Sequence, residues 1–453
     1  MLANGLGAVL FGLVTIATSF TEIFFSISDM GMQSWSIREM SRSRDSTRGI
    51  VRSLLKAKAL VAFGVFFSFS TVSLLIYGFS VFMELFVFFA FSLVADTFTL
   101  VLYSIFQATE KMPLYSFSRV LATSVFFAGS YMAVNNGGGI VFVGLSYMLS
   151  RYSALGFSLI VGVLSKLVKG PIAELPLSHV FRASAPFAVL VILTTVIPRS
   201  DIVMLSVLFT QEPQLAGIYA AALKIFLVTN MVASSLLVGL YPLLSHSFVN
   251  DLSTFKYTAR KTLKYLLMGG ALISLVFVFL SVSLISFLYR PEYSQAGILL
   301  EILGSASFLT FLRMGFDWIF NAADMQNKVV KCSSARFLTN IVLDFSVFYI
   351  GLIGIATASV LAEMAALAFY IYYVRKSSLF KLKTLSLEFS KILGATLLTI
   401  VVFVISLLIV PPLAGLIGLA VYGGILLGSF SIFSLVLVVD QDDVRLLKDV
   451  LNR

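Results

Sequence analysis

Ionisable side chains inside long apolar stretches are the residues of this sequence that point most directly to chemistry. The cations are Arg151, Arg199, Lys224 and Arg313, and the carboxylates include Asp96, Asp201, Asp317 and Glu363. A charge in hydrocarbon is costly, and it usually faces a bundle interior or a water-filled cavity, where it binds a substrate or ion or pairs with an opposite charge. These residues are therefore candidates for a transport pathway.

Two interpretations stay open for them. Arg151, Arg199 and Lys224 lie at similar depth in their apolar stretches, which favours an anion-attracting, substrate-binding cavity. Arg313 is a further candidate, but Asp317 follows it by one helical turn, so this pair also fits a self-neutralising structural contact. The four carboxylates either bind a coupling proton or sodium ion or form buried pairs with cations.

The elements that must position these charges are long apolar helices. Of the 453 residues, 59% are apolar and 12% are charged, against roughly 25% charged in a soluble domain. This composition excludes a cytosolic enzyme, a disordered regulator and a secreted disulfide scaffold. Thirteen apolar runs, most of them of about the twenty residues that cross a bilayer, are counted as spans, although the fourth is short and the boundary between 337–353 and 354–374 is soft: 6–28, 58–79, 82–106, 120–134, 140–164, 184–209, 217–245, 265–289, 296–320, 337–353, 354–374, 392–410 and 415–438. They predict an all-α, multi-pass protein of the cell membrane with about 13 transmembrane helices.

The basic residues set the expected orientation. When alternate loops are assigned to one side, 27 of the 32 Lys and Arg residues fall there, and only Arg290 lies in a loop on the other side. By the positive-inside rule, the basic side is cytoplasmic and the C-terminus lies in the cytoplasm. The net charge of +10 is then explained by topology and by contacts with anionic membrane lipids, and it requires no nucleic-acid partner.

Motifs for catalysis or metal binding are missing from the sequence. It contains no P-loop, G-x-S-x-G or H-E-x-x-H motif, and His179 and His246 lack metal-ligand spacing. We therefore expect no enzyme activity, no cofactor and no metal site. The acidic run 440–443 (DQDD) resembles a metal cluster, but Arg445 and Lys448 follow it, and we interpret it as the solvated cap of a short amphipathic helix.

Two matches indicate an internal duplication. The segments 105–110 and 319–324 share the pattern I-F-[QN]-A-x-[ED] at an offset of 214 residues, and 154–157 resembles 366–369 at an offset of 212. Because six spans separate the copies, they are parallel repeats about an axis along the membrane normal.

The offset predicts the domain organisation. An N-terminal lobe at 1–169 holds five helices, a C-terminal lobe at 182–376 holds six, and two trailing helices with a cytoplasmic tail occupy 390–453. The fold expected is two pseudo-symmetric lobes, the first lacking one helix relative to the second.

The sequence resembles the polysaccharide-export, lipid-linked oligosaccharide flippases of the multidrug/oligosaccharidyl-lipid/polysaccharide exporter superfamily. Their first cytoplasmic loop typically reads D-x-G-x followed by an R-E pair, as here at 29–32 and 38–39. The resemblance continues, with loose motifs, through 107–112, 185–186, 199–201, 217–224, 241–245 and 351–363. Members typically have fourteen helices, as two six-helix lobes and two trailing helices.

The resemblance implies a transporter that flips a lipid-linked oligosaccharide, on a polyprenyl phosphate or diphosphate, from the cytoplasmic to the outer leaflet for polysaccharide or glycan assembly. Rocking lobes would alternate access, biased by an H+ or Na+ gradient or by removal of product. Glycan-assembly proteins are expected partners. The alternative is a drug or metabolite cation antiporter of the same superfamily, whose cavity should be dominated by carboxylates. A non-transporting scaffold for glycan assembly would leave the buried charges unexplained.

Overall fold

The computed structural model describes residues 2–42, 47–78, 81–165, 167–168, 170–171, 174–377, 382–410, 413, 415–440 and 443. Helices are the only regular secondary structure in these ranges, which confirms the all-α fold class. The chain divides into two compact units, Met1–Ala220 and Ala221–Arg453. This division does not test the lobe boundaries expected from the repeat, which stay predictions.

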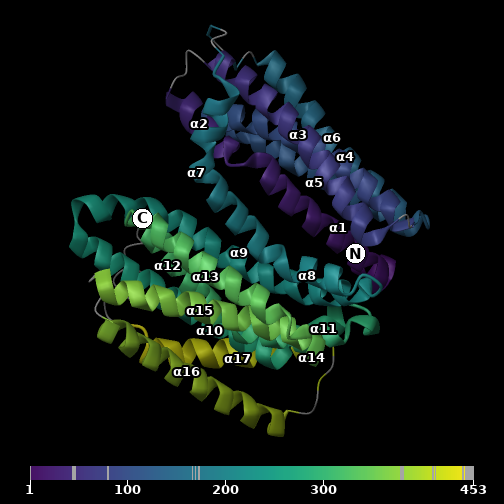
Figure 1. The fold of residues 1–453 in the computed structure, drawn as a ribbon. Coiled ribbons are helices and arrows are strands. Elements are labelled where there is room, and N and C mark those ends of the chain that lie inside the picture. Colours follow the sequence, from purple (N-terminus) through teal and green to yellow (C-terminus); the bar gives the residue numbers. More distant parts are fainter. Residues whose placement is uncertain are drawn as a thin grey trace. The chain divides into compact units, whose positions relative to one another are not determined.

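The N-terminal unit is built on two long central helices, α1 and α4. Its elements are α1 (Leu2–Asp29), α2 (Met32–Arg42), α3 (Thr47–Tyr77), α4 (Val81–Ala108), α5 (Met112–Asn135), α6 (Gly139–Leu164), α7 (Leu177–Val196), η2 (Ile197–Arg199), α8 (Ser200–Leu208) and the start of α9 (Pro213–Asn250). Helix α1 packs against α3, α4, α7 and α8, while α6 packs against both α4 and α5 (Figure 1).

The D-x-G motif forms the corner between α1 and α2. Gly31 has φ +71°, a left-handed conformation that glycine adopts without strain. The Asp29 carboxylate accepts a hydrogen bond from the Gln33 backbone N–H at 3.0 Å. Lys58 of α3, which is fully buried, donates to the Ser28 carbonyl oxygen at 2.8 Å and pairs with Asp29 at 3.2 Å. One buried cation therefore ties α3 to the end of α1.

The C-terminal unit is organised around α10. Its elements are the rest of α9, α10 (Leu252–Leu288), η3 (Pro291–Tyr293), α11 (Gln295–Ser305), α12 (Ser307–Ala322), α13 (Gln326–Asp344), α14 (Val347–Ile350), α15 (Leu352–Ser377), α16 (Leu382–Ile409) and α17 (Gly415–Leu437). Helix α10 packs against α11 and α12 and against the trailing helices α16 and α17 (Figure 1).

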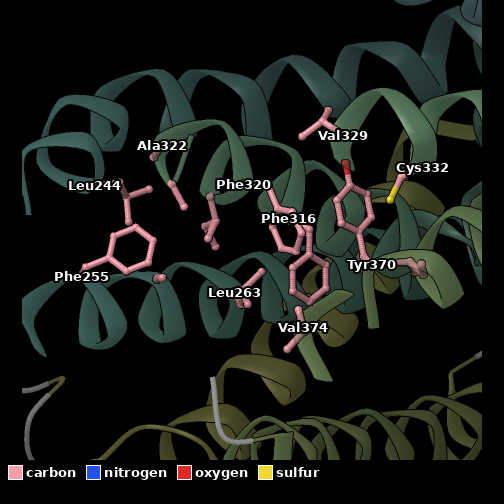
Figure 2. Packing of buried hydrophobic residues seen from close by; sticks show 14 residues of the cluster. Leu244, Phe255, Leu263, Phe316, Phe320, Ala322, Val329, Cys332, Tyr370 and Val374 are labelled. Atoms are coloured by element: carbon pink, nitrogen blue, oxygen red, sulfur yellow. The ribbon is translucent and has the colours of Figure 1, made fainter. Parts of the chain in front are cut away.

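Aromatic residues form the core between α12, α13 and α15. Figure 2 shows Phe316 and Tyr370 side by side, with Cys332 next to the tyrosine. The rings of Phe316 and Tyr370 are stacked with centroids 5.5 Å apart, and Phe320 meets Tyr370 edge to face at 5.1 Å. All four of these residues are fully buried, so this cluster fixes the packing of the three helices that surround it.

The end of α17 is held by a polar cluster that we call the C-terminal latch. It consists of Lys261, Lys264 and Tyr265 of α10, Glu388 of α16, and Asp440 and Asp443 beyond α17. The Asp443 side chain is only 1% exposed and lies 2.6 Å from each lysine. The interpretation of the acidic run as a solvated cap is therefore wrong for Asp443, because sequence spacing did not indicate the lysines that bury it. Residues 441–442 and 444–453 of that segment lie outside the described ranges.

The structure does not confirm the expected number of thirteen membrane spans. In the described ranges, ten helices are long and apolar enough to cross a membrane, and α11 with α12, bent by 47°, form an eleventh candidate. The predicted span 184–209 is broken into α7, η2 and α8, and α13 carries three basic residues. Polarity and helix breaks therefore remove these segments from a count based on length and hydropathy.

Candidate functional site

A polar cavity of about 510 Å³ lies within the N-terminal unit. Helices α1, α2, α4, α5, α6 and α7 and the η2 turn contribute to its wall. The polar lining residues are Thr21, Glu22, Gln33, Asp96, Thr99, Tyr103, Tyr115, Arg119, Thr123, Tyr147, Arg151, Thr195 and Arg199. Three arginines face two carboxylates, so the lining carries a formal surplus of one positive charge.

Arg151 lies on the α6 wall of this cavity and is held by three contacts. Its Nη2 donates to the Tyr147 hydroxyl at 2.9 Å, and its guanidinium carbon lies 4.6 Å from the centroid of the same ring. The third contact is an ion pair with Asp96 of α4, with Nε 3.6 Å from Oδ2. Tyr147 in turn stacks on Phe89 at 4.2 Å, so the arginine rests on a rigid aromatic support.

Arg199 reaches the cavity from a break in the helix. Pro198 lacks an N–H donor, and the chain passes through the 3-10 turn η2 between α7 and α8. The regular α-helix is therefore interrupted at this proline. Arg199 is the last residue of the turn, and its Nε pairs with the Glu22 carboxylate of α1. Arg151 and Arg199, both predicted site residues, therefore line one cavity, each with a carboxylate partner.

Arg119 is a cavity residue that sequence reasoning missed, because it directly precedes the apolar run 120–134 and so falls among the 27 basic residues assigned to loops. It lies in α5, and its Nη1 donates to the Tyr115 hydroxyl at 3.0 Å. The spacing Tyr-x-x-x-Arg is the same as that of Tyr147 and Arg151, and this repeated pattern was the signal available in the sequence. The ring of Tyr115 also contacts that of Tyr103 edge to face at 4.8 Å.

Two predicted site residues lie away from the cavity lining. Asp201 of α8 is buried and accepts hydrogen bonds from the Tyr219 hydroxyl and, at 3.5 Å, from Ser200. Lys224 is an exposed residue of α9 in the C-terminal unit. Both of these contacts of Asp201 are with neutral hydroxyl groups of the N-terminal unit, so the expected coupling or cation-pairing role of Asp201 stays a prediction.

The remaining predicted residues form a charge-balanced network in the C-terminal unit. Arg313 pairs with Asp317 one turn later and with Glu363 of α15, whose Oε2 lies 2.5 Å from Nε. Arg336 of α13 binds the other oxygen of Glu363 at 2.8 Å, and the Tyr370 hydroxyl donates to Asp317. Two arginines and two carboxylates bind one another here, so this network has no net charge.

The chemistry available in the N-terminal cavity is recognition of anionic and hydroxyl-rich groups. Guanidinium groups bind phosphate or carboxylate oxygens through paired N–H donors, and the tyrosine and threonine hydroxyls both donate and accept hydrogen bonds. Among the described residues, no group of His, Cys, Asp and Glu side chains has the arrangement of a metal site.

Comparison with solved structures identifies the fold. The lipid II flippase MurJ in an inward closed conformation superposes with a TM-score of 0.73 at 14% identity, covering 94% of this chain and 97% of MurJ. An inward-facing multidrug resistance MATE transporter of the MOP superfamily superposes with a TM-score of 0.72 at 13% identity, covering 83% of this chain and 93% of the transporter. The MATE multidrug transporter DinF-BH superposes with a TM-score of 0.59 at 15% identity, covering 83% of this chain and 89% of DinF-BH. The chain thus has the fold shared by these transporters.

Comparison at the level of sequence gives the family. No individual curated protein matches the chain. The sequence model of the family described as "Polysaccharide biosynthesis protein" matches residues 1–248, which is more than half of the 453 residues. A multi-pass helical membrane protein with the fold of MOP-superfamily transporters, this chain belongs to the polysaccharide biosynthesis protein family.

Proposed function

We propose that the protein flips a lipid-linked oligosaccharide between membrane leaflets, from the cytoplasmic to the outer side, for polysaccharide or glycan assembly. Its family membership and its transporter fold support this function. The carrier would be a polyprenyl phosphate or diphosphate. The cycle would be alternating access, with a proton or sodium gradient supplying direction and glycan-assembly proteins supplying and removing the substrate.

The observation that carries the proposal is the polar, arginine-lined cavity within a unit made of apolar helices. A glycan and its phosphate cannot cross hydrocarbon unaided, because each unsatisfied polar group costs several kcal/mol there. The hydroxyls of Tyr103, Tyr115 and Thr123 match the hydroxyls of a sugar, and the arginines match the phosphate. The apolar chain of the carrier needs no such wall and would remain in the bilayer.

The test fills the cavity and leaves the rest of the helix unchanged. Thr123 of α5 lines the cavity, whereas Val120, three residues earlier on the same helix, is 61% exposed and does not line it. We expect Thr123→Trp to lower flipping at least tenfold and Val120→Trp to leave it unchanged. The assay is purified protein in vesicles, with a polyprenyl diphosphate carrying a fluorescent neutral sugar and an impermeant quencher outside.

Three results would separate the alternatives. Wild-type protein that flips no lipid-linked sugar, but moves a cationic dye down a proton or sodium gradient, would favour the drug or metabolite antiporter. In this cavity Glu22 and Asp96 are both already paired with arginines, which argues against a site for cations. Flipping by Thr123→Trp at the wild-type rate would show that substrate does not pass through this cavity. Transport of neither substrate would contradict both functions.

A further inference from the structure

The three arginines of the cavity differ in how their charge is balanced. Arg151 has Asp96 as its ion-pair partner, and Arg199 has Glu22. Arg119 donates to the neutral hydroxyl of Tyr115, and no carboxylate in the described part of the chain lies within ion-pair distance of it. The single positive charge by which the lining exceeds neutrality is therefore located at Arg119.

This difference decides which arginine an incoming anion binds most readily. The Nε atom of Arg151 pairs with Asp96, and the Nε atom of Arg199 pairs with Glu22. An anion that binds at either Nε atom would therefore weaken that ion pair. Separating either ion pair leaves a carboxylate without its compensating charge, which costs more for the Asp96 side chain, 14% exposed, than for that of Glu22, 41% exposed. An anion at Arg119 displaces no carboxylate.

The side chain of Arg119 can also form a bidentate contact. A guanidinium group has five N–H donors in a planar fork, and the only hydrogen bond that this guanidinium makes in the described structure is the one to Tyr115. Its guanidinium carbon lies 5.7 Å from the centroid of the Tyr115 ring. Tyr103 supports that ring from α4, so the arginine is oriented by aromatic contacts while most of its donors remain available.

We propose that Arg119 is the residue that recognises the anionic group of the substrate, while the pairs Arg151–Asp96 and Arg199–Glu22 shape the cavity wall. This inference rests on the proposed flippase function. The anionic group is either the phosphate of the lipid carrier or the carboxylate of an acidic sugar. Both present two oxygens to the guanidinium fork, which is the shared chemistry that the site would recognise.

The test compares loss of the unbalanced charge with loss of a balanced pair. Arg119→Gln removes the surplus charge, and Arg119→Lys keeps it without the fork. The control is the double variant Arg151→Gln/Asp96→Asn, which removes one charge of each sign and leaves the net charge of the cavity unchanged. Flipping rates are measured against substrate concentration in vesicles, with the polyprenyl diphosphate carrying the neutral sugar.

We expect Arg119→Gln to raise the half-saturating substrate concentration about tenfold to hundredfold, the size expected for one charge-assisted hydrogen-bonding contact. The lysine variant should recover part of this loss, and the double variant should raise the half-saturating concentration less than Arg119→Gln does, because it leaves the surplus positive charge in place. A second readout is the melting temperature of the purified protein with inorganic diphosphate, which should rise for wild type and not for Arg119→Gln.

The outcomes distinguish this inference from the flippase function. If wild type flips both the neutral-sugar lipid and a lipid carrying a uronic acid, and Arg119→Gln has the same half-saturating concentration as wild type for both, the role of Arg119 is wrong and the flippase function stands. The role of Arg119 is also wrong if the half-saturating substrate concentration rises as much in the double variant as in Arg119→Gln. If the loss appears with a sugar carrying a uronic acid but not with the neutral sugar, Arg119 recognises the sugar carboxylate. Loss with both substrates assigns it to the phosphate of the carrier.

Discussion

The C-terminal latch gives a prediction whose size follows from the structure. Asp443 accepts three contacts at 2.6 Å, from Lys261, Lys264 and the Tyr265 hydroxyl. The Lys264 side chain is 0% exposed, so Asp443→Asn leaves a fully buried ammonium group without its nearest carboxylate. Removing one partner of a buried ion pair costs about 3–5 kcal/mol.

The surroundings of Lys264 place the expected cost at the lower end of that range, about 3 kcal/mol. Asp440 at 3.4 Å and Glu388 at 3.8 Å still offset part of its charge. We expect the melting temperature of the detergent-solubilised protein to fall by several degrees. The matched control is Glu292→Gln, at an exposed carboxylate beside Pro291, which should melt like wild type. The double variant Asp443→Asn/Lys264→Met should lose less than the sum of the two single changes.

The pH dependence of this contribution provides a second check on the same pair. Burial alone raises the pKa of Asp443, but hydrogen bonds from the Asp440 backbone, Lys261, Lys264 and Tyr265 outweigh it and hold the pKa well below its usual range. A lowered pKa in the folded state stabilises the fold above the unfolded pKa of about 4 and loses this effect as the pH falls further. The difference in melting temperature between wild type and Asp443→Asn should therefore be constant from about pH 5 to pH 8 and should shrink below about pH 4. Additive single and double variants, or a difference that does not depend on pH, would refute a buried ionised pair.

Two further predictions concern the packing of the N-terminal unit. A Cβ atom at Gly12 would lie 1.9 Å from the Pro213 carbonyl oxygen, so Gly12→Ala should lower the yield and the melting temperature of the protein. The control is Gly64→Ala, which should change neither, because nothing lies within 4 Å of a Cβ atom there. Equal melting temperatures of the two variants would contradict this close approach. Lys58→Met leaves the buried carboxylate of Asp29 without its cation and should lower the free energy of unfolding by about 3–5 kcal/mol. Adding Asp29→Asn to this variant should restore part of that free energy. A melting temperature of Lys58→Met equal to that of wild type would exclude the buried pair.

The sequence was sufficient for the fold class because the physical signal is local. Apolar runs of about twenty residues identify spans by themselves, and Pro198 marks the break at η2 because it removes a backbone donor. The exact count of spans was less accessible. Segment 337–353 reads as one run, yet α13 ends at Asp344 and α14 follows as a separate short helix. Hydropathy averages over such a break, since both sides of it are apolar.

The site was predicted only in part, because its contacts join residues far apart in the chain. Arg199 and Arg151 were identified from their depth, but the partner of Arg199 is Glu22, at a separation of 177 residues, which no spacing rule connects. Arg119 was assigned to a loop because it directly precedes the apolar run 120–134. Only the repeated Tyr-x-x-x-Arg pattern linked it to Arg151, and the meaning of that pattern depends on α5 and α6 packing side by side.

Both units contain arginines, carboxylates and tyrosines in contact with one another, but the charges are balanced differently in the two. In the C-terminal unit, Arg313 and Arg336 are matched by Asp317 and Glu363, and Tyr370 joins this network to the buried aromatic cluster of Figure 2. Such a closed network has no charge left over for a ligand, and its value lies in fixing α12, α13 and α15 together. The N-terminal cavity has one arginine more than its lining carboxylates balance. In the proposed function, one unmatched cation, Arg119, is therefore what distinguishes the N-terminal unit as the place where an anion would bind.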